Sequence, residues 1–371
     1  MTKKVFWCSS CLNMSTRPRI TFDKEGRCNA CQWSEEKKVF DWASREKLLL
    51  ENLKKHNAFR KDGYGVIVPV SGGKDGSYVA YQLKEKYGVN PLCVTIRPPL
   101  ELSVGRENIY NFVDSGFDHI HITPNKEVLQ KLNKYGLIEM GFPYYGWLIC
   151  IITAVLQISV QMGVKLIFYG EEGEIEYGGS TERKNESIYS PEFQKRVYLE
   201  GGYEKVLDKI GETDKSKLFW FQFPSDENCK EIALTHWSHY EPWDSYRNYL
   251  VAKEHCGLKE KSEPNTGTFT NFAQNDQALY SLHAYLMYLK FGFGRATQDA
   301  GIEIRRGAMT RDQGVNLVNL YDNNYPENFL ELYLNYYQMT KEEFDKVIDK
   351  WVNRDLFKKI DGRWQPLFKV E

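Results

Sequence analysis

A glycine-rich segment, Ser71-Gly72-Gly73-Lys74-Asp75-Gly76-Ser77, constrains the fold of this 371-residue chain more than any other feature. An apolar run at residues 65–70 precedes the segment, and residues 78–87 follow it with helical periodicity. A buried strand that enters a helix through a glycine turn is a building block of α/β proteins. The bare backbone amides of such a turn, the helix N-terminus and the ammonium group of Lys74 all favour a phosphate ligand. The segment is therefore predicted to be a phosphate-binding loop.

The alternation of apolar runs and helical segments continues along the chain. Further strands are predicted at residues 91–96, 119–122 and 164–170, with helices at residues 106–115 and 148–161. Strands separated by helices pair in parallel through right-handed crossovers. The predicted fold is thus α/β, an open parallel sheet with helices on both faces. Ligands on such sheets bind beyond the carboxyl ends of the strands, so the residues after each strand should converge on one crevice.

Four of the eight cysteines form two pairs near the N-terminus, Cys8-x-x-Cys11 and Cys28-x-x-Cys31. This spacing is typical of a four-thiolate zinc site, in which each pair forms one knuckle around the ion. The surrounding segment has few apolar side chains, and Zn²⁺ binding can supply its folding energy. We expect a structural role, because four cysteine ligands leave no open coordination position. Redox-active cysteine pairs are the alternative.

The charge balance and the apolar segments make some classes of ligand and some cellular locations unexpected. The 49 basic and 50 acidic residues nearly cancel, which argues against extensive contacts with nucleic acid. Residues 1–7 lack the apolar stretch of a secretory signal. The longest apolar run, residues 147–160, is shorter than a membrane span and is predicted to be a buried helix. We therefore expect a cytoplasmic protein without membrane insertion, with nucleic acid unexpected as a ligand.

The phosphate loop is not a Walker A motif, because the first glycine of Gly-x-x-x-x-Gly-Lys-Ser/Thr is missing. It resembles the PP-loop of the ATP pyrophosphatase superfamily, Ser-Gly-Gly-x-Asp-Ser, with one glycine inserted between the aspartate and the serine. The resemblance implies that ATP binds here and is cleaved between its α and β phosphates. Either Gly76 or Ser77 then stands in the place of the family serine.

Further nucleotide contacts are expected around this loop. Asp75 is a candidate ligand for the Mg²⁺ that neutralises phosphate charge. The sequence leaves open whether Glu171 and Glu172 bind Mg²⁺ or only water. By the same resemblance, the backbone after the second strand edges the adenine and the end of the fourth strand completes the pocket. These predicted ATP contacts are Thr95, Ile96, Arg97, Gly170 and Glu171.

The carboxyl-terminal half is rich in aromatic and charged residues. Residues 236–245 combine aromatic rings with carboxylates and histidines, which suits a sugar or, equally, a tyrosine-rich core edge. Asp276, His283 and Lys290 recur at a spacing of seven and are predicted to share one face of a helix beside a polar site. Residues 171–191, acidic and then glycine-rich, indicate a mobile loop over the crevice.

Three arginines are candidates for phosphate contacts, because a guanidinium group binds two oxygens in a fixed geometry. Asp276 and His283 are candidates for orienting a sugar or relaying a proton. Helical periodicity also appears at residues 327–337 and 341–356. The three arginines are Arg295, Arg306 and Arg311.

Nearly the whole chain resembles the N-acetyl sugar amidotransferases of the WbpG and PseA type, which act in bacterial lipopolysaccharide O-antigen and flagellin-glycan synthesis. The resemblance rests on the cysteine pairs, the phosphate loop, Pro242-Trp243-Asp244, and Lys290-Phe291-Gly292-Phe293-Gly294-Arg295 with residues 304–307 and 310–311. It implies conversion of a sugar acetamido group into an acetamidino group, as in pseudaminic acid derivatives. Ammonia would come from a separate glutaminase subunit of the HisH type, with or without a HisF-like protein. The sugar, free or nucleotide-linked, is not identified.

The chemistry suggests one reaction route, and two other functions are alternatives to it. An amide carbonyl is a poor electrophile, so we expect ATP to adenylate the acetamido oxygen before ammonia displaces AMP. Lys74 and Mg²⁺ would stabilise the departing pyrophosphate. The main rival is a tRNA thiolase with a zinc knuckle, but Cys93 and Cys150 fall in apolar segments, where a sulfur carrier is not expected. The other rival is a zinc-knuckle binding protein that has lost ATPase activity.

Four sections are expected from this reading. Residues 1–35 form the cysteine head and residues 36–60 a linker helix. Residues 61–220 form the ATP-binding α/β domain, and residues 221–371 a mainly helical region that contributes to the sugar site.

Overall fold

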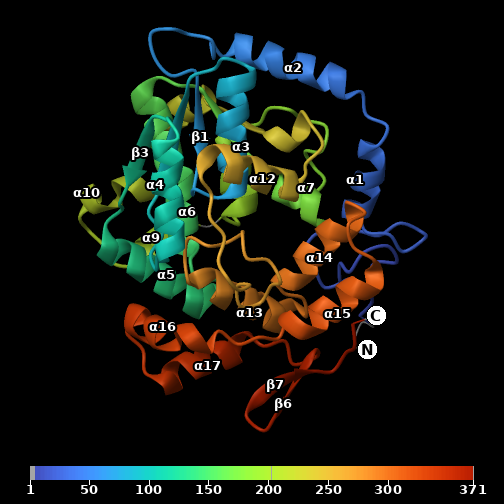
Figure 1. Ribbon diagram of the computed structural model, residues 1–371. Coiled ribbons are helices and arrows are strands. Elements are labelled where there is room, and N and C mark those ends of the chain that lie inside the picture. The colour runs from blue at the N-terminus through green and yellow to red at the C-terminus, as the bar shows by residue number, and fades with distance from the viewer. Residues whose placement is uncertain (1–4, 202, 371) are drawn as a thin grey trace.

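The computed structural model describes residues 5–201 and 203–370 and centres on a five-stranded parallel sheet (Figure 1). The strand order is β3-β2-β1-β4-β5. Four of the five strands are those predicted from the alternation of apolar runs. The strands are β1 (Val66–Pro69), β2 (Pro91–Ile96), β3 (His119–Ile122), β4 (Leu166–Tyr169) and β5 (Ala233–His236).

The fifth strand, β5, was not predicted. It pairs in parallel with β4, so that Leu166 stands opposite Ala233 and Tyr169 opposite His236. Its four residues include two polar side chains and are too few to produce a clear apolar pattern. The sheet therefore takes a strand from beyond residue 220, where the ATP-binding domain was expected to end. The first four residues of the expected head lie outside the described residues.

The sheet separates two apolar layers because successive side chains of a strand point to opposite faces. Val66 and Val68 of β1 belong to one buried cluster, and Ile67 belongs to the other. The first layer holds the linker helix that was predicted, and the second holds the long apolar helix. The helices of the first layer are α2 (Trp42–Lys55), α3 (Lys74–Tyr81), α4 (Ser103–Asp114) and α12 (Ser245–Cys256); α5 (Lys126–Met140) and α6 (Tyr145–Met162) belong to the second.

Helix α6 is the one helix among the described residues that is long and apolar enough to cross a membrane. Of its residues, 67% are buried inside the fold, and it packs against β1 and β2. It ends at Gly163, which adopts the left-handed conformation with φ of 62°. Its burial agrees with the prediction of a core helix.

The carboxyl-terminal helices gather at one end of the molecule (Figure 1). They share the larger apolar core with the sheet, because Leu282, Tyr333 and Phe344 belong to the same buried cluster as Ile67. Two antiparallel strands close the chain. These elements are α13 (Leu279–Phe291), α14 (Arg295–Arg305), α15 (Arg311–Tyr321), α16 (Leu330–Tyr337), α17 (Lys341–Trp351), β6 (Phe357–Ile360) and β7 (Arg363–Pro366).

The amino-terminal cysteine head contains α1 (Asn29–Lys37) and lies beside α14 and α15, which are distant from it in sequence (Figure 1). Ile304 of α14 packs against its cysteines. A chain of short helices connects β4 to β5, and the first of them contacts α1. These are α7 (Gly173–Tyr177), α8 (Pro191–Phe193), α9 (Tyr203–Lys209), α10 (Lys215–Leu218) and α11 (Asp226–Lys230).

Candidate functional site

The glycine-rich loop joins β1 to α3 as predicted, and α3 begins earlier than expected, at Lys74. Residues 74–77 thus form the first turn of the helix, with Gly73 as the extended N-cap. Gly72 has φ of +69°, and a Cβ atom there would lie 2.6 Å from the backbone of Asn108. Only glycine allows this close approach to α4. The loop therefore presents the N-terminus of α3 and the ammonium group of Lys74 at one point.

The inserted glycine has a packing role. A Cβ atom on Gly76 would lie 2.7 Å from the carbonyl oxygen of Pro69, so α3 can approach β1 only with glycine at this position. Gly76 lines the pocket beside the loop, whereas Ser77 is fully buried and its hydroxyl group has no hydrogen-bond partner among the described residues. Of the two residues after Asp75, Gly76 is thus the one that faces the pocket.

The loop opens into a pocket with a cavity volume of about 230 Å³. This volume is slightly below that of typical drug-sized ligand sites, about 300–1,000 Å³. The opposite wall is formed by a segment before α13 and by the first residue of α14. The pocket is lined by Ser71, Gly73, Lys74, Asp75, Gly76, Gly105, Asn108, Glu171, Phe272, Ala273, Gln274, Asn275, Asp276, Tyr280 and Arg295.

Two carboxylates face each other in this pocket. Asp75 forms an ion pair with Lys74 and accepts a hydrogen bond of 3.2 Å from Asn248 of α12. Burial and the nearby charge of Asp75 raise the pKa of Glu171 above its ordinary value. Glu171 also accepts a hydrogen bond of 3.2 Å from the hydroxyl group of Tyr177. A pair of carboxylates whose charges repel is stabilised by a divalent cation, and oxygen ligands suit Mg²⁺.

Glu172, the second carboxylate left open by the sequence, points away from the pocket. It lies 3.0 Å from Nδ1 of His236 and accepts a hydrogen bond of 2.6 Å from Tyr198. Burial raises the pKa of Glu172, but His236, Tyr198 and Arg183 lower it more, to about 2. Glu172 is thus an internal anion with its own partners, and Glu171 is the glutamate available to a ligand.

Asp276 lies in the pocket, but the predicted helix face is wrong. The helix begins at Leu279, and the backbone before it is held extended by a bridge between Glu101 and Gln277. Asp276 is therefore outside the helical register. Burial raises the pKa of Asp276 to about 7, and Tyr280 donates a hydrogen bond of 3.4 Å to its carboxylate.

His283 and Lys290 do share a face of α13, but it packs against the connection between α5 and α6. The ring of His283 lies 4.8 Å from that of Phe142, and Lys290 donates to the carbonyl of Met140 at 2.8 Å. Burial lowers the pKa of His283 to about 3, so the imidazole is neutral. Neither side chain lines the loop pocket.

The three candidate arginines have three different locations. Arg295 opens α14 and lines the pocket, paired with Asp299 at 2.8 Å. Arg306 lies in a neighbouring pocket and pairs with Glu303. Arg311 donates hydrogen bonds of 3.3 Å to the carbonyls of Cys8 and Cys11 in the head. The structure thus brings only Arg295 to the phosphate loop.

The position of Arg295 depends on a residue that the sequence did not reveal. Asp322 is buried and accepts hydrogen bonds from the backbone amides of Gly294, at 2.9 Å, and Thr297, at 3.2 Å. It therefore caps the first turn of α14. Burial raises the pKa of Asp322 to about 6 despite these bonds. A single aspartate just after a helix carries no sequence signal for this role.

The strand ends expected to edge the adenine lie beside the pocket rather than in its lining. Thr95 is buried and donates to the carbonyl of Val70, and the carbonyl of Ile96 accepts a hydrogen bond of 3.2 Å from Trp147. Arg97 is exposed and pairs with Glu101. The backbone of β2 is thus adjacent to the loop through its pairing with β1.

Part of the aromatic segment at residues 236–245 also reaches this region. The indole of Trp243 packs against Gly170, where a Cβ atom would lie 3.0 Å from both Trp243 and Asp75. Trp243 and Tyr177 line a second pocket of about 320 Å³. Its other lining residues lie in or next to α1, α2, α7 and α14 and in the segment before α12: Ser34, Lys37, Lys38, Trp42, Glu176, Pro242, Ile302, Arg305 and Arg306.

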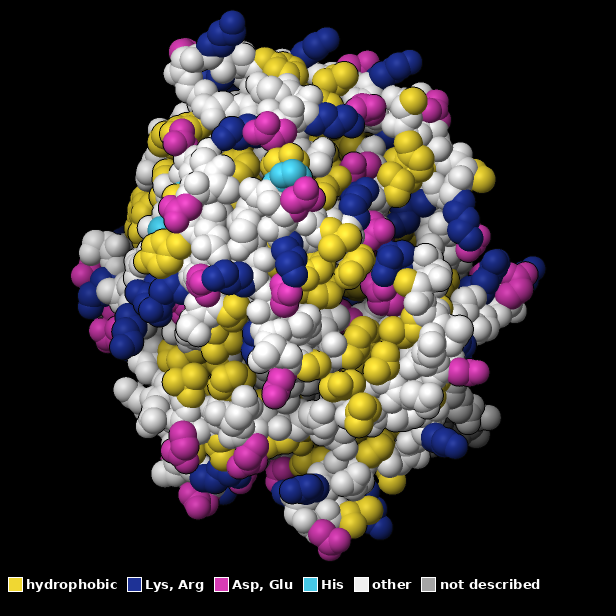
Figure 2. All heavy atoms as spheres, viewed as in Figure 1, with side chains coloured by type: hydrophobic (Ala, Val, Ile, Leu, Met, Phe, Trp, Pro, Cys, Tyr) yellow, Lys and Arg dark blue, Asp and Glu magenta, His cyan; other side chains and the backbone are white. Residues whose placement is uncertain are grey.

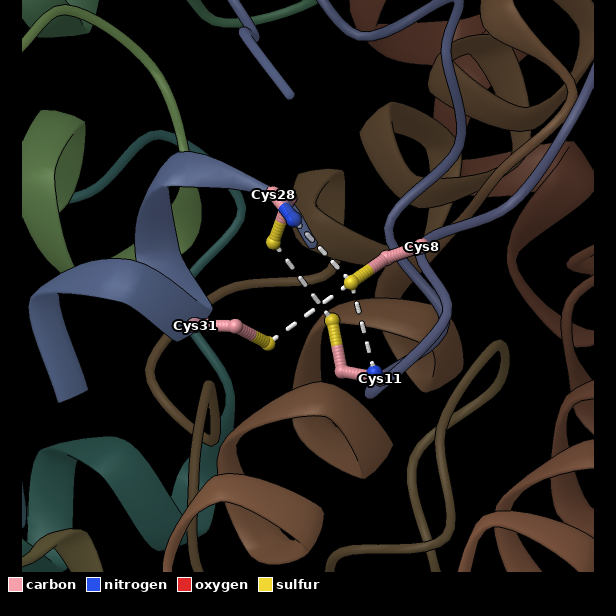
Figure 3. Close-up of side chains that lie close together, drawn as sticks. All are labelled: Cys8, Cys11, Cys28 and Cys31. Carbon is pink, nitrogen blue, oxygen red and sulfur yellow. Dashed lines mark hydrogen bonds between the residues drawn. The ribbon is translucent and has the colours of Figure 1, made fainter. Parts of the chain in front are cut away.

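The four head cysteines are buried and their sulfur atoms lie within 4.8 Å of one another (Figure 3). Two sulfur pairs, Cys8–Cys31 and Cys11–Cys28, are 3.7 Å apart. Four ligands at the usual Zn–S distance in a tetrahedron would be separated by about 3.8 Å. Backbone amides point at the sulfur of Cys8 from Ser10, Cys11 and Cys28, at 3.2–3.4 Å. Such donors stabilise thiolates, so these residues can bind a metal ion such as zinc.

The segment expected to be a mobile loop contains α7, and the head holds this helix. Glu174 accepts two hydrogen bonds from Arg19, at 2.7 and 2.9 Å. Glu176 accepts hydrogen bonds from Trp33, at 3.0 Å, and Lys37, at 2.7 and 2.8 Å. In this conformation, the segment lies between the head and the pocket and is held by its hydrogen bonds to the head.

The cysteines outside the head are unsuited to nucleophilic chemistry. Burial raises the pKa of all four thiols, that of Cys256 to about 11. The thiolate is the reactive form, so these groups are largely unreactive near neutral pH. They are Cys93, Cys150, Cys229 and Cys256.

The surface carries charges of both signs. On the face shown in Figure 2, basic and acidic side chains are interspersed, with apolar patches between them.

Comparison with known proteins gives a match for one part of the chain. No curated protein matches this sequence. Residues 266–370 match the family model described as LPS biosynthesis protein WbpG-like, C-terminal domain. The match includes the pocket residues Phe272, Asp276, Tyr280 and Arg295. The carboxyl-terminal part of this chain is therefore similar to that of WbpG-like proteins of lipopolysaccharide biosynthesis.

Proposed function

We propose that this protein is an ATP-dependent amidotransferase that converts the acetamido group of a sugar into an acetamidino group in the cytoplasm. One observation carries the proposal: a single pocket is lined by the phosphate loop and by residues of the WbpG-like domain. The loop supports nucleotide binding, and the domain supports a role in lipopolysaccharide or related surface-glycan synthesis. A pocket that joins the two suits a reaction between ATP and a sugar.

ATP would bind with its phosphates at the start of α3 and its adenine beyond β2, as in PP-loop proteins. The amides of residues 71–73 and the ammonium group of Lys74 would bind the phosphates. Asp75 and Glu171 would hold Mg²⁺, which neutralises the charge of the phosphates. Lys74 pairs with Asp75 in this structure and would pair with phosphate oxygens once a cation takes over the carboxylate.

The sugar would lie on the opposite wall, near Phe272 and Tyr280. Its acetamido oxygen attacks the α-phosphorus, the bond to the β-phosphate breaks, and pyrophosphate leaves toward Lys74. Ammonia then adds to the imidate carbon, and AMP leaves with the original oxygen. Arg295 would balance the negative charge of the α-phosphate. Orientation and charge stabilisation would supply most of the rate enhancement.

Asp276 is the proposed general base. Ammonia becomes cationic when it adds to carbon, so a base must accept a proton before AMP leaves. The pKa of Asp276, raised to about 7 by burial, makes its carboxylate basic enough for this step near neutral pH. The neutral His283, expected to share this role, packs elsewhere and is not part of the proposal.

Ammonia would come from a separate glutaminase subunit, of the HisH type with or without a HisF-like protein. The raised pKa of the thiols outside the head argues against a glutaminase nucleophile in this chain. The same observation weighs against a tRNA thiolase, which needs a reactive sulfur carrier beside the nucleotide.

A direct assay tests the proposal. Purified protein is supplied with ATP, Mg²⁺, ammonium and a panel of free and nucleotide-linked acetamido sugars, and pyrophosphate and product masses are measured. We expect pyrophosphate and AMP in equal amounts and a product lighter than the sugar by about one mass unit, since NH replaces O. Lys74→Met should abolish both products, whereas Lys84→Met, at a half-buried position outside the pocket lining, should not. Pyrophosphate release with bulk tRNA but with no sugar would refute the proposal.

A further inference from the structure

The cysteine cluster and the phosphate-loop pocket are joined by two side chains. Asn13 is buried, and its amide nitrogen donates to the sulfur of Cys28 at 3.3 Å and to the carbonyl oxygen of Tyr177 at 3.0 Å. The hydroxyl group of Tyr177 in turn donates to the carboxylate of Glu171 at 3.2 Å. Glu171 lines the pocket beside Lys74. Tyr177 thus links the two sites: its backbone carbonyl accepts from Asn13, which also bonds the sulfur of Cys28, and its hydroxyl group bonds the pocket carboxylate.

Helix α7, which carries Tyr177, depends on the head for its position. It has five residues, too few for a helix that is stable without tertiary contacts. Its main external partners are head residues: Arg19 binds Glu174, and Lys37 binds Glu176. Both ion pairs are partly shielded, since the two glutamates are 14% and 12% exposed.

The backbone conformation at the end of α7 allows close contact with the head. Gly178 has φ of +94°, and a Cβ atom there would lie 2.7 Å from the amide nitrogen of Asn13. Asn29 donates to the carbonyl of Gly179 at 2.6 Å. The two head asparagines therefore bond the carbonyls on either side of Gly178, and a side chain at residue 178 would prevent this approach.

The head itself depends on its cysteines. Its buried cluster consists of the four cysteines and Ala30, with Ile20, Phe22 and Ile304 packed against it. A core this small supplies little folding energy, so we expect metal binding by the thiolates to contribute to the order of the segment. Asn13 also donates its backbone amide to the sulfur of Cys11, at 3.4 Å. Its orientation is thus fixed by the cluster on one side and by Tyr177 on the other.

We infer that Asn13 and Tyr177 are positioning residues, through which the metal-loaded cysteine head orients Glu171 in the phosphate-loop pocket. Mg²⁺ requires near-ideal octahedral geometry, so a displaced carboxylate would bind it less tightly. Partners outside the ligand shell alter metal affinity by about 10- to 100-fold when removed. The effect on Mg²⁺ rests on the proposed function, but the ordering of α7 by the head does not.

Hydrogen exchange tests the ordering step without any ligand. Amide exchange of residues 171–180 is compared in the full-length wild type, Asn13→Ala and the control Gln32→Ala. Gln32 makes a similar amide-to-carbonyl bond, but to Arg27 within the head. We expect faster exchange in Asn13→Ala and after zinc removal by a chelator, and wild-type exchange in Gln32→Ala. Unchanged exchange in both Asn13→Ala and chelated protein would overturn the inference.

Nucleotide binding tests the consequence for the pocket. The variant Tyr177→Phe removes only the hydroxyl group that bonds Glu171, so its zinc content and thermal midpoint should stay at wild-type values. We expect the Mg²⁺ concentration needed for half-maximal binding of α,β-methylene-ATP to rise about 10-fold in Tyr177→Phe and in Asn13→Ala. An unchanged Mg²⁺ dependence in both variants would contradict the positioning role. If the wild type binds no nucleotide, the proposed function fails, and hydrogen exchange alone decides the inference.

Discussion

At the scale of single residues, the pocket contains carboxyl groups whose pKa values are shifted by burial. Glu171 and Asp276 have raised pKa values because the folded chain removes them from water. Lys74 is 8% exposed and has its neighbour Asp75 as a counter-ion. Such groups are costly to bury, and their convergence in one pocket is typical of a functional site.

Asp276 provides a test through pH. Its carboxylate forms as pH rises through about 7, so the rate of amidine formation should rise across that range. Asp276→Asn should lose this limb and most of the activity, by about 100-fold or more. The measurement is the pH dependence of kcat/KM, with the exposed Asp208→Asn as control. A limb near pH 7 that persists in Asp276→Asn would contradict the assignment.

As pH rises through the range in which activity increases, the stability of the folded protein should decrease. A carboxyl group with a raised folded-state pKa favours folding at low pH, and this contribution is lost as pH rises from about 4 to 7. Asp276→Asn should therefore have a higher thermal midpoint than the wild type at pH 8, with little difference at pH 4.

At the scale of elements, the contact between α3 and β1 depends on glycine. Gly76→Ala should destabilise the fold by about 1–3 kcal/mol, because the added methyl group would collide with the carbonyl of Pro69. Urea unfolding measures this change. At Gly63, by contrast, an added Cβ atom would meet only the flexible end of Arg60, at 3.4 Å, so Gly63→Ala should change stability by about 0.5 kcal/mol or less. Equal stability of the two variants would show that α3 can shift away from β1.

The cysteine head is the second element-scale test. The wild type should contain about one zinc per chain, since four thiolates complete a tetrahedral site. Cys28→Ser should lose the metal and lower the thermal midpoint, whereas Cys229→Ser, outside the head, should retain it. Elemental analysis and thermal unfolding provide the two readouts. Unchanged zinc in Cys28→Ser would disprove the site.

At the scale of the whole molecule, the sheet and the WbpG-like domain share one apolar core. Ile67 and Val94 of the sheet belong to the same buried cluster as Leu282, Tyr333 and Trp364 of the matched region. Two parts that share a core cannot unfold independently without exposing it. The pocket is therefore lined by residues from two parts of the chain that fold together.

This shared core predicts cooperative unfolding. Calorimetry of the full chain should give a single transition for the sheet and residues 266–370, monitored together by circular dichroism and tryptophan fluorescence. A separate, earlier loss of structure after zinc chelation should be confined to the head and α7. Two well-separated transitions in the metal-loaded protein would contradict the shared core.

Much of the fold follows from local sequence. Strands β1 to β4, helix α6 and the cysteine cluster were predicted because apolar periodicity, glycine turns and ligand spacing are properties of short segments. The glycine turn between β1 and α3 was predicted for the same reason. Strand β5 was missed because its four residues carry no pattern of their own.

The composition of the pocket was decided by tertiary structure. Among the predicted catalytic residues of the carboxyl-terminal half, Asp276 and Arg295 reach the phosphate loop, whereas His283, Arg306 and Arg311 lie elsewhere. Sequence spacing cannot distinguish these cases, because each depends on how a helix packs against distant elements. The sequence alone determined the strand-loop-helix unit and the cysteine cluster, whose geometry is local. Only the folded chain decided which distant side chains face the loop, since long-range packing sets their direction.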